Sequence, residues 1–142
     1  NCDWSSDVCS SDLASGTLEG YGSPTDPWAD AVAQALEQME RGVTAWMASS
    51  DLAGYALCRG LMQRGVRIPE DVSVTGFDAS SLVPQGNCPL LTSVDSSPHD
   101  MGAAALQLVE ARLAKPSSPA MRIQFDCSLR PGQSTGPASV SG

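Results

Sequence analysis

The sequence has few basic residues, a single histidine and no closely paired cysteines, and each shortage argues against a class of protein. Eight Lys and Arg residues stand against 16 Asp and Glu residues, and the net charge of -8 disfavours a chain that grips nucleic-acid phosphates or anionic lipid with its own surface. The five cysteines include no CxxC pair and His99 is the single histidine, which argues against a Cys/His zinc site. No stretch approaches the ~20 apolar residues of a transmembrane helix.

What is present fits one globular domain. The chain has 142 residues, of which 42% are hydrophobic and 17% are charged, a composition typical of a folded domain and not of a disordered segment. The cysteines are scattered and odd in number, as in proteins of the reducing cytosol.

Residues 1–26 differ in composition from the rest of the chain. They are rich in Ser, Asp and Gly, and the tetrapeptide SSDV at 5–8 returns as SSDL at 10–13. The run WSSDVCSSDL resembles translated sequencing-adapter sequence. We therefore expect residues 1–13 to be foreign to the protein, and residues 1–26 to form a non-native or disordered leader. We also expect the native N-terminal part of the protein to be missing from this sequence. A flexible acidic arm is the alternative.

From Trp28 onward, helical and strand patterns alternate through short loops. We expect helices over 28–41, 51–64 and 98–114, strands over 44–48, 72–76, 90–94 and 123–127, and a flexible tail over 131–142. Such alternation predicts a doubly wound α/β fold with a parallel sheet covered on both faces.

Polar side chains follow three of the predicted strands, where ligands of open parallel sheets bind. Ser50 and Asp51 follow the first strand, Asp78 the second and Ser96 the third. A carboxylate at a strand end can accept hydrogen bonds from adjacent hydroxyls, an arrangement that suits a sugar or another polyol. The ordinary alternatives are that Ser50 caps a helix and Asp51 stabilises its first turn. Ser97, before a proline, is expected only to cap the next helix.

Two longer motifs carry the most specific signal. They are the run TAWMASSDLAGYALCRGLMQRGVRIPEDVSVTGFD and the later run PLLTSVDSSPHDMGAAALQLV. Their spacing resembles the lac/gal repressor (LacI/GalR) family of bacterial transcription regulators, over about residues 31–130. The resemblance implies the C-terminal part of an effector-binding domain with the periplasmic-binding-protein fold, so that residues 27–130 form a partial type I domain.

The same resemblance implies a function and a set of site residues. Members of this family are cytoplasmic regulators in which a small effector, often a sugar or a nucleobase-like molecule, lies between two subdomains and changes how a homodimer holds operator DNA. Asp78 falls on the family's effector-binding aspartate, and Ser50 falls where many members carry an asparagine. Asp51 matches the acid of the S-D pair, and Ser96 lies near a further contact position.

An effector-stacking aromatic residue is also expected from the family. Trp28 or Tyr21 is the candidate, and a packing role at the helix entrance is the alternative for Trp28. No cofactor, metal or membrane partner is implied. The shorter side chain of Ser50 shortens its reach toward a sugar.

The family pattern divides the chain between two subdomains. It crosses from one to the other near residues 94–97, so the helix over 98–114 should belong to the subdomain that the sequence lacks. We expect this helix to pack imperfectly or to expose Leu106, Leu108 and Val109. No helix-turn-helix motif is present, so operator DNA is expected to be held by an N-terminal domain outside this sequence.

Two other classes of function share some of these features. A periplasmic sugar-binding protein of an ABC transporter has the same fold and is the alternative to a regulator. An enzyme is disfavoured, because the sequence contains no G-x-S-x-G elbow, no P-loop and no G-x-G-x-x-G motif.

Overall fold

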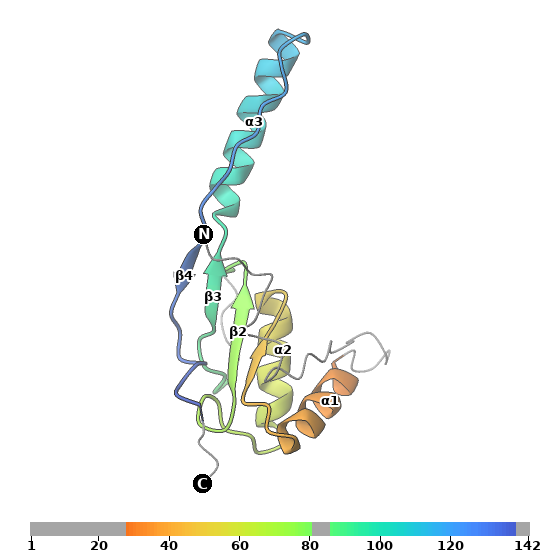
Figure 1. Ribbon diagram of the computed structural model, residues 1–142, viewed down its shortest axis with the longest axis vertical. Helices are drawn as coiled ribbons and strands as arrows, with labels where there is room; N and C mark the ends of the chain where they lie inside the picture. Colours follow the sequence, from red (N-terminus) through yellow and green to blue (C-terminus); the bar gives the residue numbers. More distant parts are fainter. Residues whose placement is uncertain (1–27, 81–85, 139–142) are drawn as a thin grey trace, which may run out of the picture.

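The computed structural model describes residues 28–80 and 86–138, and its sheet has the strand order β1-β2-β3-β4 (Figure 1). The expected leader over 1–26, with Tyr21, lies outside the described residues. The elements, in chain order, are α1 (Ala29–Glu40), β1 (Ala45–Met47), α2 (Asp51–Met62), β2 (Ser73–Phe77), β3 (Thr92–Asp95), α3 (Pro98–Ala114) and β4 (Ser128–Arg130).

The first three strands are parallel, as expected, and the fourth is not. Ala45 pairs with Ser73 between β1 and β2, and Thr75 pairs with Thr92 between β2 and β3. β4 runs antiparallel to β3, and the Arg130 guanidinium contacts the carboxylate of Asp95 at 2.5 Å. The predicted α/β class is confirmed, with a mixed sheet in place of a wholly parallel one.

The strand expected over 123–127 is wrong, because β4 begins only at residue 128. The apolar residues Ile123 and Phe125 alternate as they would in a strand, but no other strand lies beside them to complete a ladder. The chain becomes a strand only where it reaches the free edge of β3.

The two helices that follow turn signals in the sequence form close to where they were expected. Ser50 is the N-cap of α2, and its hydroxyl oxygen accepts a hydrogen bond from the Ala53 N–H (3.3 Å). α2 ends at Met62, and Gly65 then adopts a φ of 85° that a glycine tolerates. α1 ends just before Gly42, which has a φ of 97°.

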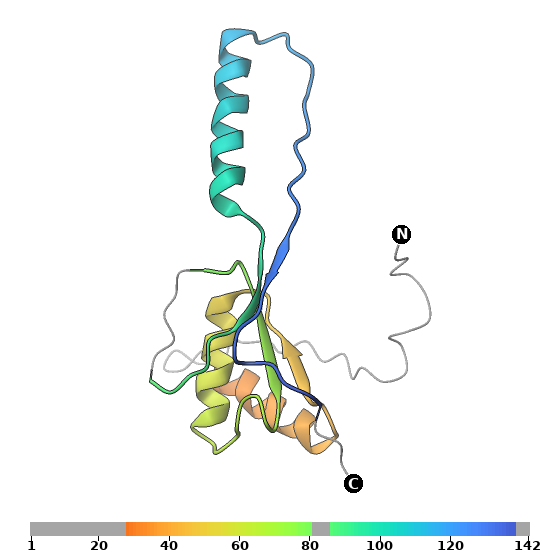
Figure 2. The same ribbon diagram turned by 90° about the vertical axis from the view of Figure 1, so that its left-hand side faces the viewer.

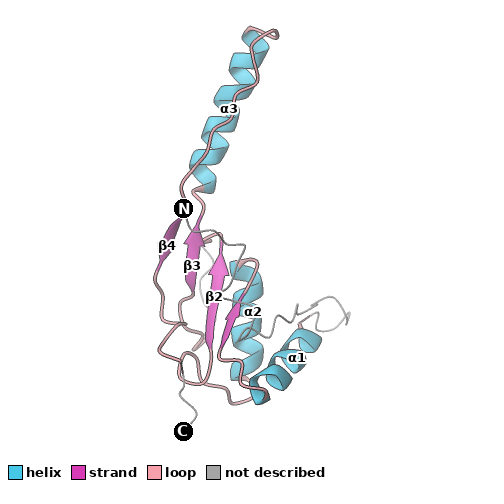
Figure 3. Ribbon diagram, viewed as in Figure 1, coloured by secondary structure: helices cyan, strands magenta, loops and turns pink. Residues whose placement is uncertain are grey.

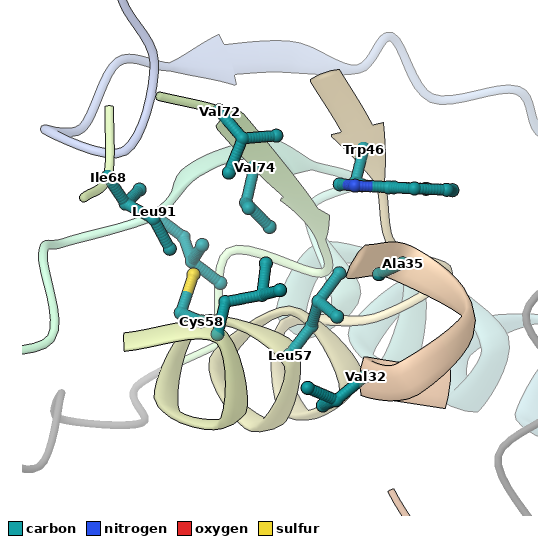
Figure 4. Close-up of a cluster of buried hydrophobic side chains, with 10 residues drawn as sticks. Val32, Ala35, Trp46, Leu57, Cys58, Ile68, Val72, Val74 and Leu91 are labelled. Carbon is teal, nitrogen blue, oxygen red and sulfur yellow. The ribbon is translucent and has the colours of Figure 1, made fainter. Parts of the chain in front are cut away.

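The hydrophobic core lies between the sheet and the pair α1 and α2, which cover one face (Figure 4). Leu61 of α2 is fully buried in one cluster with Val74 of β2 and with Val72, which precedes that strand. Gly60 lets the helices approach, because a Cβ there would collide with the side chain of Val32. The cluster consists of Val32, Ala35, Trp46, Leu57, Cys58, Leu61, Ile68, Val72, Val74 and Leu91.

α3 does not cover the other face of the sheet, contrary to the expected doubly wound layout. α3 and the returning chain project beyond the end of β3, which Figures 1 and 2 show from two sides. No residue of α3 is buried; Leu106 and Val109 are 60% and 55% exposed, as expected, whereas Leu108 is half-buried. We call residues 98–127 the arm, and the remaining described residues the body.

The turn into the arm explains why the expected cap at Ser97 is wrong. Ser97 has a left-handed backbone with a φ of 54°, and its side chain makes no capping hydrogen bond. Its N–H instead donates to the Asp95 carboxylate (2.8 Å), so that Asp95 holds the turn from which the chain leaves the sheet.

The segment after Pro131, expected to be a flexible tail, contacts the body as far as Gly136. Ser134 is fully buried, and its hydroxyl accepts a hydrogen bond from the Thr92 N–H (2.9 Å) and donates one to the Val74 carbonyl (2.5 Å). Gly132 lies against the backbone of Leu91 with no space for a Cβ. These long-range contacts leave no pattern within the segment itself, which is why composition alone suggested a tail.

Candidate functional site

Three strand ends meet at one edge of the sheet and carry the predicted site residues. Because β1, β2 and β3 are adjacent and parallel, the residues that follow them lie along the same edge (Figure 3). Ser50 follows β1, Asp78 follows β2 and Ser96 follows β3. The structure therefore places these three residues on neighbouring strand ends, in the layout that parallel sheets use to bind ligands.

Asp78 lies at the middle of this edge in an unusual backbone conformation. Its φ is 98°, and the following Ala79 also has a positive φ of 43°. Non-glycine residues rarely adopt such values, and they persist only where the surrounding structure holds them. The Asp78 N–H donates to the Val94 carbonyl (2.9 Å), which fixes the turn against β3.

The carboxylate of Asp78 remains open to solvent. The residue is exposed, and no Lys, Arg or His side chain of the described residues forms an ion pair with it. A rim carboxylate of this kind can accept hydrogen bonds from two ligand hydroxyls. In the protein without ligand, the carboxylate stays hydrated.

Ser50 and Ser96 are half-buried on either side of Asp78. The hydroxyl oxygen of Ser50 accepts the capping bond from Ala53, which leaves its O–H free to donate. Capping and ligand binding are thus compatible for this side chain. Trp28 is half-buried at the N-cap position of α1, the helix that packs on α2.

Asp51 lies in the interior and not at the rim, and its ligand role stays a prediction. It is only 3% exposed, and both carboxylate oxygens already accept hydrogen bonds from its own chain. Its donors are the hydroxyl of Ser93 (2.5 Å), and the N–H (2.6 Å) and hydroxyl (3.1 Å) of Ser80.

Ser80 and Ser93 are the residues that sequence reasoning missed. Ser93 lies inside β3, within the T-S-V motif, and a serine in the middle of a predicted buried strand was a signal that could have been followed. Ser80 lies in an irregular loop and offered no signal, because its partner is 29 residues away in sequence.

The I-P-E-D-V motif forms a turn remote from this edge, before the start of β2. The Arg67 guanidinium and N–H both donate to the Asp71 carboxylate, and these bonds lower the pKa of Asp71 to about 2. Ile68 is buried in the core. The motif therefore serves the fold.

The thiols of Cys58, in α2, and of Cys88, in the loop before β3, are neighbours. Cys58 is buried, and burial, followed by the neighbouring Cys88, raises the pKa of its thiol well above the usual range. Burial also raises the pKa of Cys88. Neutral thiols are poor metal ligands. Among the described residues, no three His, Cys, Asp or Glu side chains are arranged to hold a metal ion.

Comparison with known families agrees with this geometry. A family model described as a periplasmic binding protein-like domain matches residues 14–135. The chain belongs to this family. The match begins before the expected boundary at residue 27 and extends beyond residue 130, so the sequence likeness is wider than the expected partial domain.

The relatives define the branch of the family. The chain is 34% identical, over 115 residues, to the HTH-type transcriptional regulator CelR of Thermobifida fusca, a match that covers 80% of this chain and 33% of CelR. The expected kinship with LacI/GalR regulators is confirmed. These relatives are regulators, not enzymes or transport proteins. The chain spans about a third of the length of CelR.

Solved structures show the same likeness. A complex of the transcriptional regulator CelR with cellobiose superimposes with a TM-score of 0.66 at 31% identity, over 75% of this chain and 32% of that one. A LacI-family regulator from Sanguibacter keddieii superimposes with a TM-score of 0.63 at 30% identity, over 77% of this chain and 40% of that one. In the described part of the chain, no helix is both long and apolar enough to cross a membrane.

Proposed function

We propose that this chain is the C-terminal portion of the effector-sensing domain of a cytoplasmic LacI-type regulator, and that its strand-end edge contributes half of a sugar site. In the complete protein, a second subdomain would close over this edge, two copies would form a homodimer, and an N-terminal domain outside this sequence would hold operator DNA. The kinship with regulators, one of them solved with cellobiose, supports this assignment.

The observation that carries the proposal is the strained turn at Asp78. Two consecutive non-glycine residues with positive φ are held at the rim of the sheet, and the first of them presents an exposed carboxylate. A backbone of this kind costs about 1–3 kcal/mol per residue. Glycine would avoid that cost, so the presence of Asp and Ala in this turn favours a functional role for the Asp78 side chain. Ser50 and Ser96 supply neighbouring hydroxyls, and Trp28 is the candidate for a stacking surface.

The test is calorimetry of the full-length regulator with cellobiose, ribose and sucrose. Removing the charge with Asp78→Asn should weaken the best-bound sugar by about tenfold or more, since a hydrogen bond to a charged group contributes about 1.5–3 kcal/mol. Glu40→Gln, an exposed carboxylate at the end of α1, is the matched control and should leave the affinity unchanged. Unchanged affinity in Asp78→Asn would refute the site assignment.

A further inference from the structure

Asp51 is a buried acid whose role neither the helix cap nor the rim explains. It is the first residue of α2, but its carboxylate points to the neighbouring strands: Oδ1 accepts from Ser93 of β3, and Oδ2 accepts from Ser80 beyond β2. No basic side chain of the described residues pairs with it. A buried carboxylate without a cation is costly unless donors surround it, so these bonds are what keeps Asp51 in place.

The donors that surround Asp51 belong to the turn that presents Asp78. Three successive N–H groups of this turn are fixed: that of Asp78 by the Val94 carbonyl (2.9 Å), that of Ala79 by the Ser93 hydroxyl (3.1 Å), and that of Ser80 by the Asp51 carboxylate (2.6 Å). Because the Ser93 hydroxyl donates its proton to Asp51, its oxygen is left to accept from Ala79. Two of these three hydrogen bonds thus depend on Asp51: that of Ser80 directly, and that of Ala79 through the Ser93 hydroxyl.

Gly76 in β2 makes room for this arrangement. A Cβ at this position would collide with Oδ1 of Asp51 and would lie 3.2 Å from a methyl carbon of Leu91. Any larger residue there would push the carboxylate away from Ser93. The glycine of the G-F-D motif and the aspartate of the S-D pair therefore form one packing unit, 25 residues apart in sequence (76 − 51).

We propose that Asp51 is a positioning residue, which acts through Ser93 and Ser80 to hold Asp78 in the strained turn where its carboxylate faces the effector. Asp51 itself never touches the ligand. This inference rests on the proposed function for its last step only, since the hold on the turn exists without a ligand. The class of ligand that benefits is a polyol, whose two adjacent hydroxyls require a carboxylate of fixed orientation.

The first experiment measures amide hydrogen exchange in this chain, for the wild type and for Asp51→Asn. Asparagine keeps the size but loses the charge and one of the two acceptor oxygens, so exchange at Ala79 and Ser80 should accelerate by at least about tenfold relative to the core amides of Leu61 and Val74. Asp71→Asn, which alters a half-buried acid in a remote turn, is the control and should leave exchange at Ala79 and Ser80 unchanged relative to the core amides.

Ser93→Ala is the second variant and keeps the test valid if Asp51→Asn fails to fold. It removes the hydroxyl that links Asp51 to the Ala79 N–H and leaves the bonds between Asp51 and Ser80. Amide exchange should therefore accelerate at Ala79 and not at Ser80. The proposal is overturned if, in the variant that folds, exchange at the turn amides and at the core amides accelerates by the same factor. Such a uniform change would mean that Asp51 only stabilises the fold.

Sugar affinity of the full-length regulator then separates the two proposals. We expect Asp51→Asn to weaken cellobiose, or the best-bound sugar of the panel, by about tenfold, in step with the loosened turn. If the turn loosens but Asp78→Asn binds as the wild type does, the proposed function fails and the positioning role stands. If Asp78→Asn loses affinity but Asp51→Asn keeps both affinity and turn protection, the positioning role is wrong.

Discussion

The body and the arm of this molecule both carry large apolar side chains, but only the body buries them. In the body, Leu61 is fully enclosed by residues of α1, α2 and the sheet. In the arm, no residue is buried, and Leu113 is 76% exposed. Leucine therefore stabilises the fold in the body, whereas in the arm it forms an apolar surface that no other part of the described chain covers. A sequence pattern states which face of a helix is apolar, and the rest of the chain decides whether that face has a partner.

A pair of identical substitutions should give the largest contrast between the two regions. Leu61→Ala removes a fully buried side chain and leaves a cavity, so it should lower the free energy of unfolding by about 2–5 kcal/mol. Leu113→Ala should change it by less than about 0.5 kcal/mol. Urea denaturation, followed by circular dichroism, measures both. Equal losses would mean that the arm is packed in solution.

The second contrast concerns self-association. Leu106 and Val109 lie on one side of α3, and an exposed apolar surface of this kind drives contacts between copies. We expect the wild-type chain to associate, and Leu106→Glu with Val109→Glu to weaken association by about tenfold or more, since each buried side chain contributes at least about 1.5 kcal/mol. Sedimentation velocity measures the change. A wild-type chain that stays monomeric at all concentrations would contradict this expectation.

The third contrast tests the segment that follows β4. Ser134→Ala leaves the Thr92 N–H and the Val74 carbonyl without their partner in the interior, which should cost about 1–3 kcal/mol of unfolding free energy. Ser117→Ala, on the exposed turn of the arm, is the matched control, with an expected change below about 0.5 kcal/mol. Thermal unfolding of both variants provides the comparison. A neutral Ser134→Ala would show that the hydrogen bonds of Ser134 do not support the core.

The smallest effect is the pH dependence of the Arg67–Asp71 turn. Since the pKa of Asp71 is lowered from 3.8 to about 2, its contribution to stability is present above pH 3.8 and is lost as the pH falls through 2. A carbon-detected NMR titration of the Asp71 carboxyl should give a midpoint near 2. Arg67→Ala should move this midpoint back toward 3.8, and an unchanged midpoint would contradict the assignment.

The sequence predicted well those features that depend on neighbouring residues. The N-cap of Ser50, the helix that follows it and the place of Asp78 after β2 could all be deduced from local patterns, because caps, turns and strand ends are defined within a few residues. The exposure of Leu106 and Val109 was deduced from the resemblance to a two-subdomain family.

Features that depend on distant partners could not be predicted in this way. Asp51 looks like an ordinary first-turn acid, and only the approach of Gly76 and Ser93 shows that it belongs to the interior. Ser134 looks like part of a polar tail until it meets Val74, 60 residues earlier in the chain. Residues 123–127 have a strand pattern but lie beside no other strand.

We propose that the body supports itself and presents one half of a sugar site, whereas the arm has no support of its own. Residue-resolved amide hydrogen exchange on this chain, at a concentration where it is monomeric, tests this claim directly. We predict that α2 and β2 exchange only through global unfolding, whereas α3, a helix with no buried residue, exchanges orders of magnitude faster. Protection of α3 equal to that of α2 would contradict the account.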